Sequence, residues 1–244
     1  MTSPMPNFDC PIPTGNEFKK WRLDNGLSIS EATEFFGFKN ISSIYQIESG
    51  KRGVPKHIAM VISMTDFGVS AASSLTAKET QMIIGLSEKA NNQRVSGRVQ
   101  DRGSNIVDIS TRAVDVWVIH EDYEWLDNLI VSEIRAKNEE HYDFDLTGLI
   151  ERPQLMRYKE GGHYDWHIDI GRGDNSTRKL SVSWVLNSDF DGGDLCFFQE
   201  REIGISFREG QGCVFPSFMP HKVQPVTSGE RWALVAWISG TPFR

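Results

Sequence analysis

Two histidines and one aspartate in the second half of the chain are spaced in a way that suits a metal ion. His167 and Asp169 are two residues apart, and in an extended strand such residues point to the same face. An imidazole nitrogen and a carboxylate oxygen can therefore reach one ion. His221, which follows the segment Phe215-Pro216-Ser217, is the third candidate ligand. Three ligands on one side of an ion leave its opposite side open for small molecules.

A second pair of the same form lies just before the first. His163-Tyr164-Asp165 is also a His-x-Asp motif, and it has the same strand parity as His167-Ile168-Asp169. Parity alone does not choose between the two pairs. If the later pair binds the ion, His163 and Asp165 are expected to be polar residues of a loop near the entrance to the site.

Arg231 is the candidate for binding an anionic small molecule. It comes directly before the strand-like run 232–238, so its side chain can point into the same cavity as the three metal ligands. A guanidinium offers a planar, two-pronged donor to a carboxylate, which a lysine ammonium does not. The alternative is a surface salt bridge.

Taken in order, these residues resemble the Fe(II)- and 2-oxoglutarate-dependent dioxygenase superfamily, and within it the prolyl-4-hydroxylase-like branch. The resemblance covers residues 99–244 and rests on the combination of motifs rather than on any one of them. Its pattern places a tyrosine and glycines ahead of the ligand pair, which favours His167 and Asp169 over the earlier pair. The matching features are Tyr158, Gly161-Gly162, Tyr164, His167, Asp169, the strand Leu180–Leu186, Gly192-Gly193-Asp194, His221 and Arg231.

The resemblance implies a role for each candidate residue. His167, Asp169 and His221 would bind Fe(II), and Arg231 would bind the distal carboxylate of 2-oxoglutarate with help from the Tyr158 hydroxyl. His167, Asp169, His221 and Arg231 are then the expected catalytic residues. O2 is the other cosubstrate, and decarboxylation to succinate and CO2 would be coupled to hydroxylation of a C–H bond. Many prolyl hydroxylases have lysine in place of Arg231, so the exact subfamily is left open.

Three functions fit these residues. The first is hydroxylation of an amino-acid side chain in a protein or peptide, with proline the leading guess by family analogy. The second is a nucleic-acid oxidative demethylase. The resemblance to those enzymes would require an Arg-x5-Arg pattern, and Trp237 is found where the second arginine would be. The third is a DNA-binding regulator whose barrel senses 2-oxoglutarate, iron or oxygen. The full ligand set favours an enzyme.

The second half of the chain reads as strands and turns that can hold such a site. Short apolar runs separated by Gly, Asp and Pro predict a double-stranded β-helix (jelly-roll) domain over residues 99–244. The expected strands are 180–186, 195–198, 212–215 and 232–238, with a strand at Val114–Val118 and a flanking helix around 125–134. Trp166 and Trp184 either line the substrate groove or pack in the core, and burial in the core is favoured.

Residues 14–68 predict a small all-α domain, so the whole chain is expected to be α+β. Residues 69–98 read as a linker of small residues with a helical segment around Met82, Ile83 and Leu86. Three short helices are expected in the N-terminal domain. The first has Phe18, Trp21 and Leu23 as apolar anchors; the second begins at a Ser28–Glu31 capping box and ends at Gly37; the third is capped by Asn40, buries Ile41, Ile44 and Ile47, and ends at Ser49-Gly50, with further helix at 58–62.

This N-terminal pattern resembles the helix-turn-helix domain of phage-repressor-type regulators, most specifically in the segment 48–52. The resemblance implies that polar residues of the third helix face the DNA major groove and that two basic residues lie near phosphate. These are Ser42, Ser43, Tyr45 and Gln46, with Lys51 and Arg52. Residues 1–80 contain as many acidic as basic residues, whereas DNA-binding domains usually have a basic surface. A DNA partner and a protein partner therefore both stay open.

Composition sets outer limits on the function. The net charge of −7 argues against binding of a polyanion by the whole chain. Three scattered cysteines, Cys10, Cys196 and Cys213, fit neither a disulfide framework nor a zinc motif. No run approaches the length of a membrane span and the first residues do not resemble a signal peptide. We therefore expect a cytoplasmic protein with no membrane partner.

Overall fold

The computed structural model divides the chain into two compact units, Met1–Phe67 and Gly68–Arg244, and each is described by itself. Within them, the structure describes residues 12–24, 27–35, 38–55, 58–59, 68–89, 94–97, 99–101, 104–121, 123–198 and 202–241.

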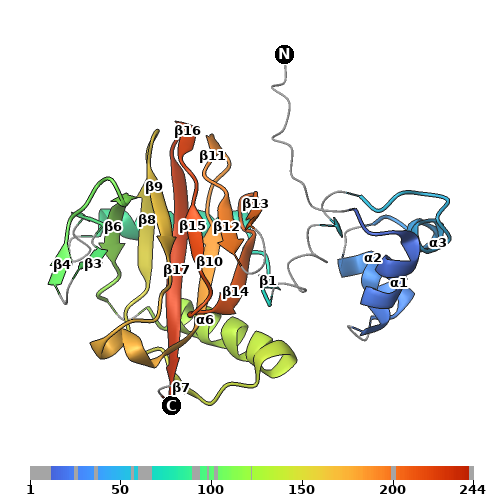
Figure 1. Ribbon diagram of the computed structural model, residues 1–244, viewed down its shortest axis with the longest axis horizontal. Coiled ribbons are helices and arrows are strands. Elements are labelled where there is room, and N and C mark those ends of the chain that lie inside the picture. The colour runs from blue at the N-terminus through green and yellow to red at the C-terminus, as the bar shows by residue number, and fades with distance from the viewer. Residues whose placement is uncertain are drawn as a thin grey trace. The chain divides into compact units, whose positions relative to one another are not determined.

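The first unit is a small helical bundle around an apolar core (Figure 1). Its described helices are α1 (Gly15–Asp24), α2 (Ile29–Phe35) and α3 (Ser42–Glu48). The Ser28–Glu31 capping box is confirmed, because the Ser28 amide donates to the Glu31 carboxylate at 2.8 Å and the Glu31 amide to the Ser28 hydroxyl at 3.2 Å. The buried core residues are Phe18, Trp21, Ala32, Ile44, Ile47, Val54, Ile58 and Ala59.

Three details of the predicted helices are wrong. Leu23 and Ile41 are exposed rather than buried, because each lies on the side of its helix that turns away from the core. Asn40 does not cap α3; the helix begins after Ile41, and the Asn40 side chain accepts a hydrogen bond from the Ser42 hydroxyl instead. The predicted helix end at Gly37 and most of the helix predicted at 58–62 lie outside the described residues.

The end of α3 agrees with the sequence, and it joins α3 to α1. The helix stops at Ser49, and Gly50 follows with a φ of 72°, which glycine adopts without strain. Glu48 forms a buried ion pair with Arg22 of α1 at 2.5 Å. Ser42, Tyr45, Gln46, Lys51 and Arg52 are exposed. The helix-turn-helix identity of this unit, and its DNA or protein partner, stay predictions.

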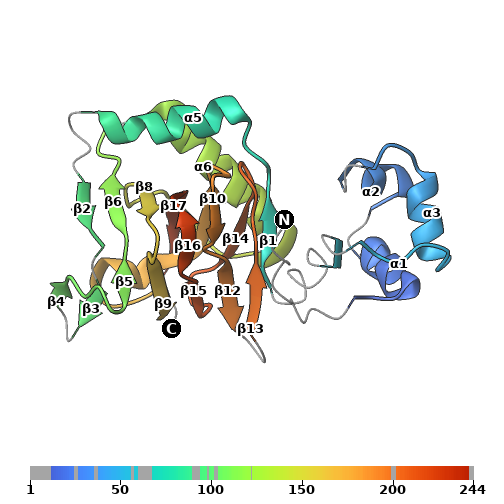
Figure 2. The ribbon, with the colours of Figure 1, turned by 90° about the horizontal axis from the view of Figure 1, so that it is seen from above.

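The second unit is built on two sheets whose strands run side by side (Figures 1 and 2). The larger sheet has the order β1-β14-β10-β17-β8-β6-β2, with β7 paired to β17. Its strands are β1 (Ser70–Ala72), β2 (Arg94–Ser96), β6 (Asp115–Val118), β7 (Leu146–Gly148), β8 (Gln154–Tyr158), β10 (Arg178–Val185), β14 (Gly212–Pro216) and β17 (Arg231–Gly240).

The smaller sheet has the order β13-β12-β15-β9-β5. Its strands are β5 (Arg112–Ala113), β9 (His163–His167), β12 (Leu195–Phe198), β13 (Glu202–Ile205) and β15 (His221–Val223). Two two-stranded sheets complete the strands: β3 (Val99–Asp101) pairs with β4 (Ser104–Ile106), and β11 (Phe190–Gly192) pairs with β16 (Val226–Gly229), which lies much later in the chain. The four strands predicted after residue 154 are confirmed as β10, β12, β14 and β17.

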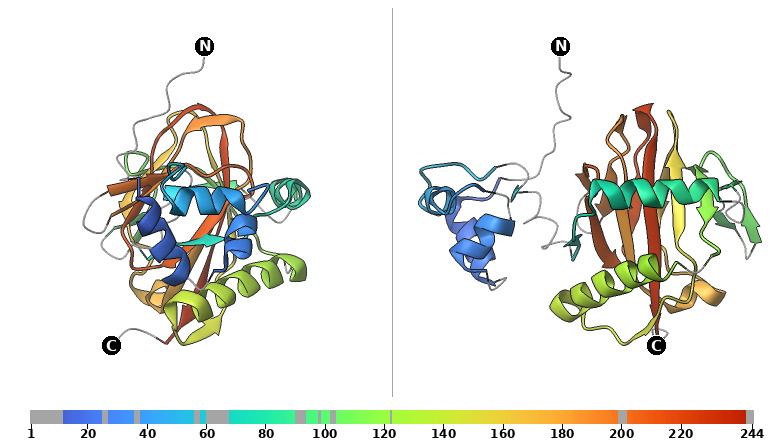
Figure 3. Two further views of the ribbon diagram at one scale, coloured as in Figure 1. Left: turned by 90° about the vertical axis from the view of Figure 1, so that its right-hand side faces the viewer. Right: turned by 180° about the vertical axis from the view of Figure 1, so that it is seen from behind.

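Two helices cover one face of the larger sheet, as Figures 2 and 3 show. They are α5 (Ala77–Gly85), followed by the 3-10 turn η1 (Leu86–Glu88), and α6 (Glu124–Lys137), which continues into the π-helical turn η2 (Asn138–Tyr142). The predicted helix at 125–134 is confirmed, since Leu126, Ile130 and Ile134 of α6 are fully buried. They pack with Ile83 of α5 in one apolar core with the strands. A further 3-10 turn, η3 (Gly173–Thr177), precedes β10.

The segment 69–98 is part of this folded unit rather than a linker. Ser70–Ala72 pairs with Val214–Gly212 as the edge strand of the larger sheet. The Tyr142 hydroxyl contacts the Ser70 hydroxyl and the Val214 carbonyl, at 2.9 and 2.8 Å, and so ties this edge to η2. Small residues resemble a linker in sequence, yet they also fit an edge strand that is packed against a helix.

Two smaller predictions concern the cysteines and membranes. Cys196 and Cys213 are buried free thiols, as expected, and Cys10 lies outside the described residues. None of the helices in the described ranges is long and apolar enough to cross a lipid bilayer.

Candidate functional site

A cavity of about 620 Å³ lies between the two sheets of the second unit. The larger sheet contributes Tyr158, Ser183 and Arg231 to its wall, and the smaller sheet contributes His167 and His221. Asp169 follows the end of β9 and also lines the cavity. The metal-ligand candidates, Arg231 and Tyr158, which were predicted from the sequence, therefore all line the same cavity.

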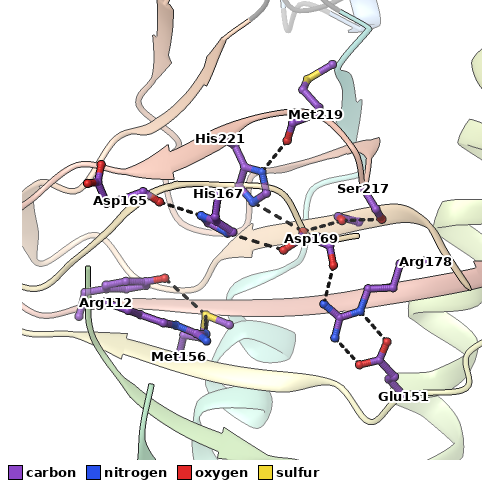
Figure 4. A network of polar contacts seen from close by, with 12 residues as sticks. Arg112, Glu151, Met156, Asp165, His167, Asp169, Arg178, Ser217, Met219 and His221 are labelled. Carbon is purple, nitrogen blue, oxygen red and sulfur yellow. Dashed lines mark hydrogen bonds and ion pairs between the residues drawn. The ribbon is translucent and has the colours of Figure 1, made fainter. Parts of the chain in front are cut away.

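The three predicted ligand residues meet at one point of the cavity wall (Figure 4). His167 Nε2 lies 3.6 Å from one carboxylate oxygen of Asp169, and His221 Nε2 lies 3.6 Å from the other. One ligand atom from each residue lies within 4.8 Å of the others. The strand pairing explains this, because His167 of β9 is directly opposite His221 of β15.

Both imidazoles are oriented by backbone carbonyls through their other nitrogen. His167 Nδ1 lies 2.8 Å from the Asp165 carbonyl, and His221 Nδ1 lies 2.9 Å from the Met219 carbonyl. Each Nδ1 is thus assigned as the N–H donor, and each Nε2 keeps its lone pair for the cavity. Burial and the neighbouring His167 lower the pKa of His221 to about 4, so this ring is neutral at neutral pH.

Asp169 is buried and held by two serines. The Ser181 hydroxyl donates to the Asp169 carboxylate at 2.7 Å and lies 2.9 Å from the Ser217 hydroxyl. The backbone amide of Asp169 donates to the Ser217 carbonyl at 2.9 Å. Burial opposes the carboxylate charge, but His221, His167 and Ser181 outweigh it and hold the pKa of Asp169 well below its usual range. The carboxylate is therefore fixed in position and ionised.

Arg178 supports the same aspartate from the opposite direction. Its Nη1 donates to the Asp169 backbone carbonyl at 3.0 Å. Its other guanidinium nitrogens bind Glu151 in a two-pronged ion pair (Figure 4). The guanidinium also lies over the Trp237 ring, 4.0 Å from its centroid. The loop that bears Asp169 is thus attached to β10 by Arg178 and to the β14–β15 turn by Ser217.

Arg231 begins β17 and is 2% exposed. Its guanidinium lies 5.4 Å from the centroid of the Tyr158 ring, and the two residues are paired across β17 and β8. Within the described part of the chain, the Arg231 guanidinium has no ion-pair partner. A buried cation that faces a cavity without a carboxylate partner is suited to an anionic ligand. The Tyr158 hydroxyl lies 3.4 Å from the Met156 sulfur.

Aromatic stacking extends the site away from the ligand residues. The Tyr164 ring stacks on the His167 ring with centroids 3.5 Å apart. The Arg112 guanidinium also lies over the Tyr164 ring, 4.4 Å from its centroid. Tyr164 and Arg112 both line the cavity.

The earlier His-x-Asp pair does not join the cluster. His163 Nδ1 lies 3.0 Å from the Gly161 carbonyl and His163 Nε2 lies 3.1 Å from the Ser110 carbonyl, so both ring nitrogens face acceptors. Asp165 is exposed, and its carboxylate accepts the Trp166 amide at 2.8 Å. Neither residue has a lone pair or an oxygen directed at the cavity centre.

The two tryptophans have different surroundings. Trp184 is buried, and its indole N–H donates to the Ser73 carbonyl at 3.0 Å, which agrees with a core role. Trp166 lines the cavity and is 37% exposed. Its ring meets Phe198 edge to face at 6.0 Å, and the Lys222 ammonium lies 4.6 Å from its centroid. Trp166 is therefore a residue of the cavity rim.

Sequence reasoning missed the residues that hold the aspartate, namely Arg178, Ser181 and Ser217. One signal was present in β10, where Ser181 and Ser183 alternate with the apolar residues Leu180, Val182 and Trp184. That alternation indicates a polar face turned toward a cavity. The contact between Arg178 and Glu151 had no comparable signal, because it joins the start of β10 to a segment before β8 that is remote in sequence.

Known proteins resemble the part of the chain that carries this cluster. Residues 153–239 match the family model of the 2OG-Fe(II) oxygenase superfamily. The matched segment contains His167, Asp169, His221 and Arg231. This superfamily implies Fe(II), 2-oxoglutarate and O2, and the His-Asp-His cluster is compatible with iron.

The relatives with similar sequences are PKHD-type hydroxylases. That of Idiomarina loihiensis is 33% identical over 93 residues, which is 36% of this chain and 42% of the relative. That of Synechococcus sp. is 36% identical over 98 residues, covering 39% and 44%. That of Sphingopyxis alaskensis is 33% identical over 117 residues, covering 45% and 53%. The chain thus spans about half the length of these relatives.

Solved structures show the same fold at lower identity. The prolyl hydroxylase of Trichoplax adhaerens, solved with a peptide of the hypoxia inducible factor, aligns over 74% of this chain and 88% of its own with a TM-score of 0.58 and 20% identity. A Pseudomonas putida prolyl-4-hydroxylase aligns over 75% and 98% with a TM-score of 0.55 and 21% identity. The sheet-rich core is therefore similar to the prolyl hydroxylase jelly roll.

The donor set of the cavity fits the groups that the superfamily binds. Two imidazoles and one ionised carboxylate are a suitable set for Fe(II). Arg231 supplies a buried positive charge for the far carboxylate of a dicarboxylic acid. The cavity of about 620 Å³ is large enough for both and for part of a substrate.

Proposed function

We propose that this chain is an Fe(II)- and 2-oxoglutarate-dependent dioxygenase that hydroxylates an amino-acid side chain in a protein or peptide, with proline as the first candidate. The observation that carries the proposal is the meeting of His167, Asp169 and His221 in a cavity that also contains the buried Arg231 guanidinium. Iron, 2-oxoglutarate and O2 together would supply the oxidising chemistry.

The chain's own residues have distinct tasks under this proposal. His167, His221 and Asp169 would hold the metal at the cavity wall. Arg231 would bind the distal carboxylate of 2-oxoglutarate, and Tyr158, whose ring lies beside the guanidinium, would assist it through its hydroxyl. Each histidine keeps its lone pair available because its Nδ1 proton is engaged by a backbone carbonyl.

A peptide substrate is supported by the rim of the cavity. Trp166 and Ile168 line the cavity and are exposed, and Phe198 packs against Trp166 at the surface. Exposed apolar side chains at the mouth of a cavity are a usual feature of surfaces that bind peptides. The relative from Trichoplax adhaerens was solved with a peptide, which points to the same substrate class.

The test is formation of succinate. Purified protein is incubated without oxygen with Fe(II) and 2-oxoglutarate, oxygen is admitted, and succinate is measured for the wild type, His221→Ala and His163→Ala. We expect succinate from the wild type and from His163→Ala but only background from His221→Ala. Equal yields from wild type and His221→Ala would refute the proposal.

A second assay separates the substrate classes. Candidate peptides are screened for a mass gain of one oxygen, and alkylated DNA is screened for loss of methyl groups. A gain on a proline-containing peptide supports side-chain hydroxylation. Methyl loss from DNA without any peptide product would favour the demethylase instead, and specific DNA binding without succinate would favour the regulator. The cytoplasmic location stays a prediction.

A further inference from the structure

Gly193 lies against the side chain of Arg231 in a way that no other residue type permits. A Cβ atom on Gly193 would lie 2.7 Å from Arg231 Cδ and 3.1 Å from Val226 Cγ2. Gly193 has a φ of 66°, and its amide donates a hydrogen bond to the Pro225 carbonyl at 3.1 Å. Its backbone is therefore held by the residue that precedes β16. The absence of a side chain at this position is what gives the Arg231 methylenes their space.

The rest of the Arg231 side chain is enclosed. The residue is 2% exposed, the Tyr158 ring lies beside its guanidinium, and Asp194 and Cys213 are near enough to act on its charge. The cavity is the open space that this side chain adjoins. An added Cβ at Gly193 would therefore displace the Arg231 side chain, and the cavity is the open space into which it can move.

We infer that Gly193 is a positioning residue that sets how far Arg231 stands back from the metal-binding cluster, and so selects the length of the 2-oxo diacid. This inference rests on the proposed function. The metal-binding cluster fixes one end of a bound 2-oxo acid, and Arg231 fixes the distal carboxylate. The spacing between them then decides whether a diacid of four, five or six carbons makes both contacts.

The experiment compares binding of three diacids to protein loaded with Mn(II) in place of iron, without oxygen. The diacids are oxaloacetate, 2-oxoglutarate and 2-oxoadipate, and affinities are measured by calorimetry. We expect the wild type to bind 2-oxoglutarate about tenfold more tightly than either oxaloacetate or 2-oxoadipate. A diacid of the wrong length cannot reach both the metal site and Arg231, so it loses a charge-assisted hydrogen bond. Gly193→Ala should bind 2-oxoglutarate about tenfold more weakly and shift its preference toward oxaloacetate.

Gly192→Ala is the matched control. Gly192 also has a positive φ, of 73°, but a Cβ there would meet the Pro225 carbonyl and Thr227 rather than Arg231. Both variants place alanine at a positive φ, and the Gly192 clash is with backbone atoms, so only Gly193→Ala should alter diacid preference. Mn(II) affinity and the thermal unfolding midpoint are measured alongside, to separate displacement of Arg231 from general damage.

The possible results are distinguishable. A parallel loss for all three diacids, or equal changes in Gly192→Ala and Gly193→Ala, would overturn the role of Gly193. Equal affinity of the wild type for the three diacids would also overturn the inference, whether or not Gly193→Ala folds, since it would contradict selection by length. Wild-type protein that binds Mn(II) but no diacid would instead refute the proposed function.

Discussion

The two His-x-Asp pairs of β9 have the same residue types and opposite surroundings. His167 presents a free Nε2 to the cavity, while both nitrogens of His163 lie against backbone carbonyls. Asp169 is buried among hydrogen-bond donors, whereas Asp165 is exposed. A short motif is therefore only a list of donor atoms, and the surrounding contacts decide whether these atoms can bind a metal.

An irregular pairing between β9 and β15 separates the two pairs. His221 is opposite His167 but Val223 is opposite Tyr164, so two steps along β15 match three steps along β9. Tyr164 and His167 consequently stack on the same side of the strand although they are three residues apart. In regular pairing His163 and His167 would share one face, and the irregularity removes that equivalence.

The largest expected contrast comes from removing each histidine. His167→Ala and His221→Ala should each lower metal affinity by more than about 100-fold, since loss of a ligand costs more than loss of a residue that only supports one. His163→Ala should leave metal affinity within about threefold of wild type, because neither of its nitrogens faces the cavity. Mn(II) binding followed by electron paramagnetic resonance measures all three. Equal losses for His163 and His167 would end the distinction between the pairs.

The next contrast concerns the residues that hold Asp169. Ser181→Ala removes the hydroxyl that donates to the Asp169 carboxylate, and we expect metal affinity to fall about 10-fold to 100-fold. Ser183→Ala is the matched control, since Ser183 lies on the same strand and lines the same cavity but is not bonded to Asp169. Titration with Mn(II) distinguishes them. If the two variants behave alike, the orientation of Asp169 does not depend on Ser181.

Local patterns in the sequence were enough for four strands, and the order of motifs led to the three residues that cluster in the cavity wall. Alternating apolar runs located β10, β12, β14 and β17, and the order of motifs selected His167, Asp169 and His221. The period of α6 was equally clear, because its apolar residues recur on one face that packs on the sheet. The strands and α6 depend on residues that are near one another in the chain, whereas His221 was identified only from the order of the motifs.

Features that depend on distant partners were not predictable. The register of β9 against β15 is a property of two strands more than fifty residues apart, so parity within β9 was uninformative. The edge strand β1 resembled a linker because its pairing comes from β14. Leu23 and Ile41 were assigned to the core from apolar character alone, although exposed apolar residues are common.

A weaker contrast is expected in acid. The pKa of His221 falls from an ordinary value of 6.5 to about 4 on folding, so between these values the unfolded chain binds more protons than the folded one. The free energy of unfolding of the metal-free protein should therefore decrease by on the order of 1–3 kcal/mol as pH falls from 6.5 to 4. His221→Gln should flatten this slope. Urea unfolding with a chelator present, at a series of pH values, measures it, and an unchanged slope in His221→Gln would count against the burial of a neutral ring.

The smallest contrast has the opposite sign. Contacts with the Gly161 and Ser110 carbonyls raise the pKa of His163, because two acceptors are satisfied together only by the protonated ring. This contribution to stability is present below the ordinary pKa of 6.5 and is lost as pH rises through the folded value. Since His163 is only partly buried, we expect this contribution to the free energy of unfolding to be only about a few tenths of a kcal/mol. His163→Gln should be less stable than wild type near pH 5.5 and should match it more closely at pH 8. If the stability difference between His163→Gln and wild type instead grew with pH, the ring of His163 would be held in its neutral form, and the raised pKa would be refuted.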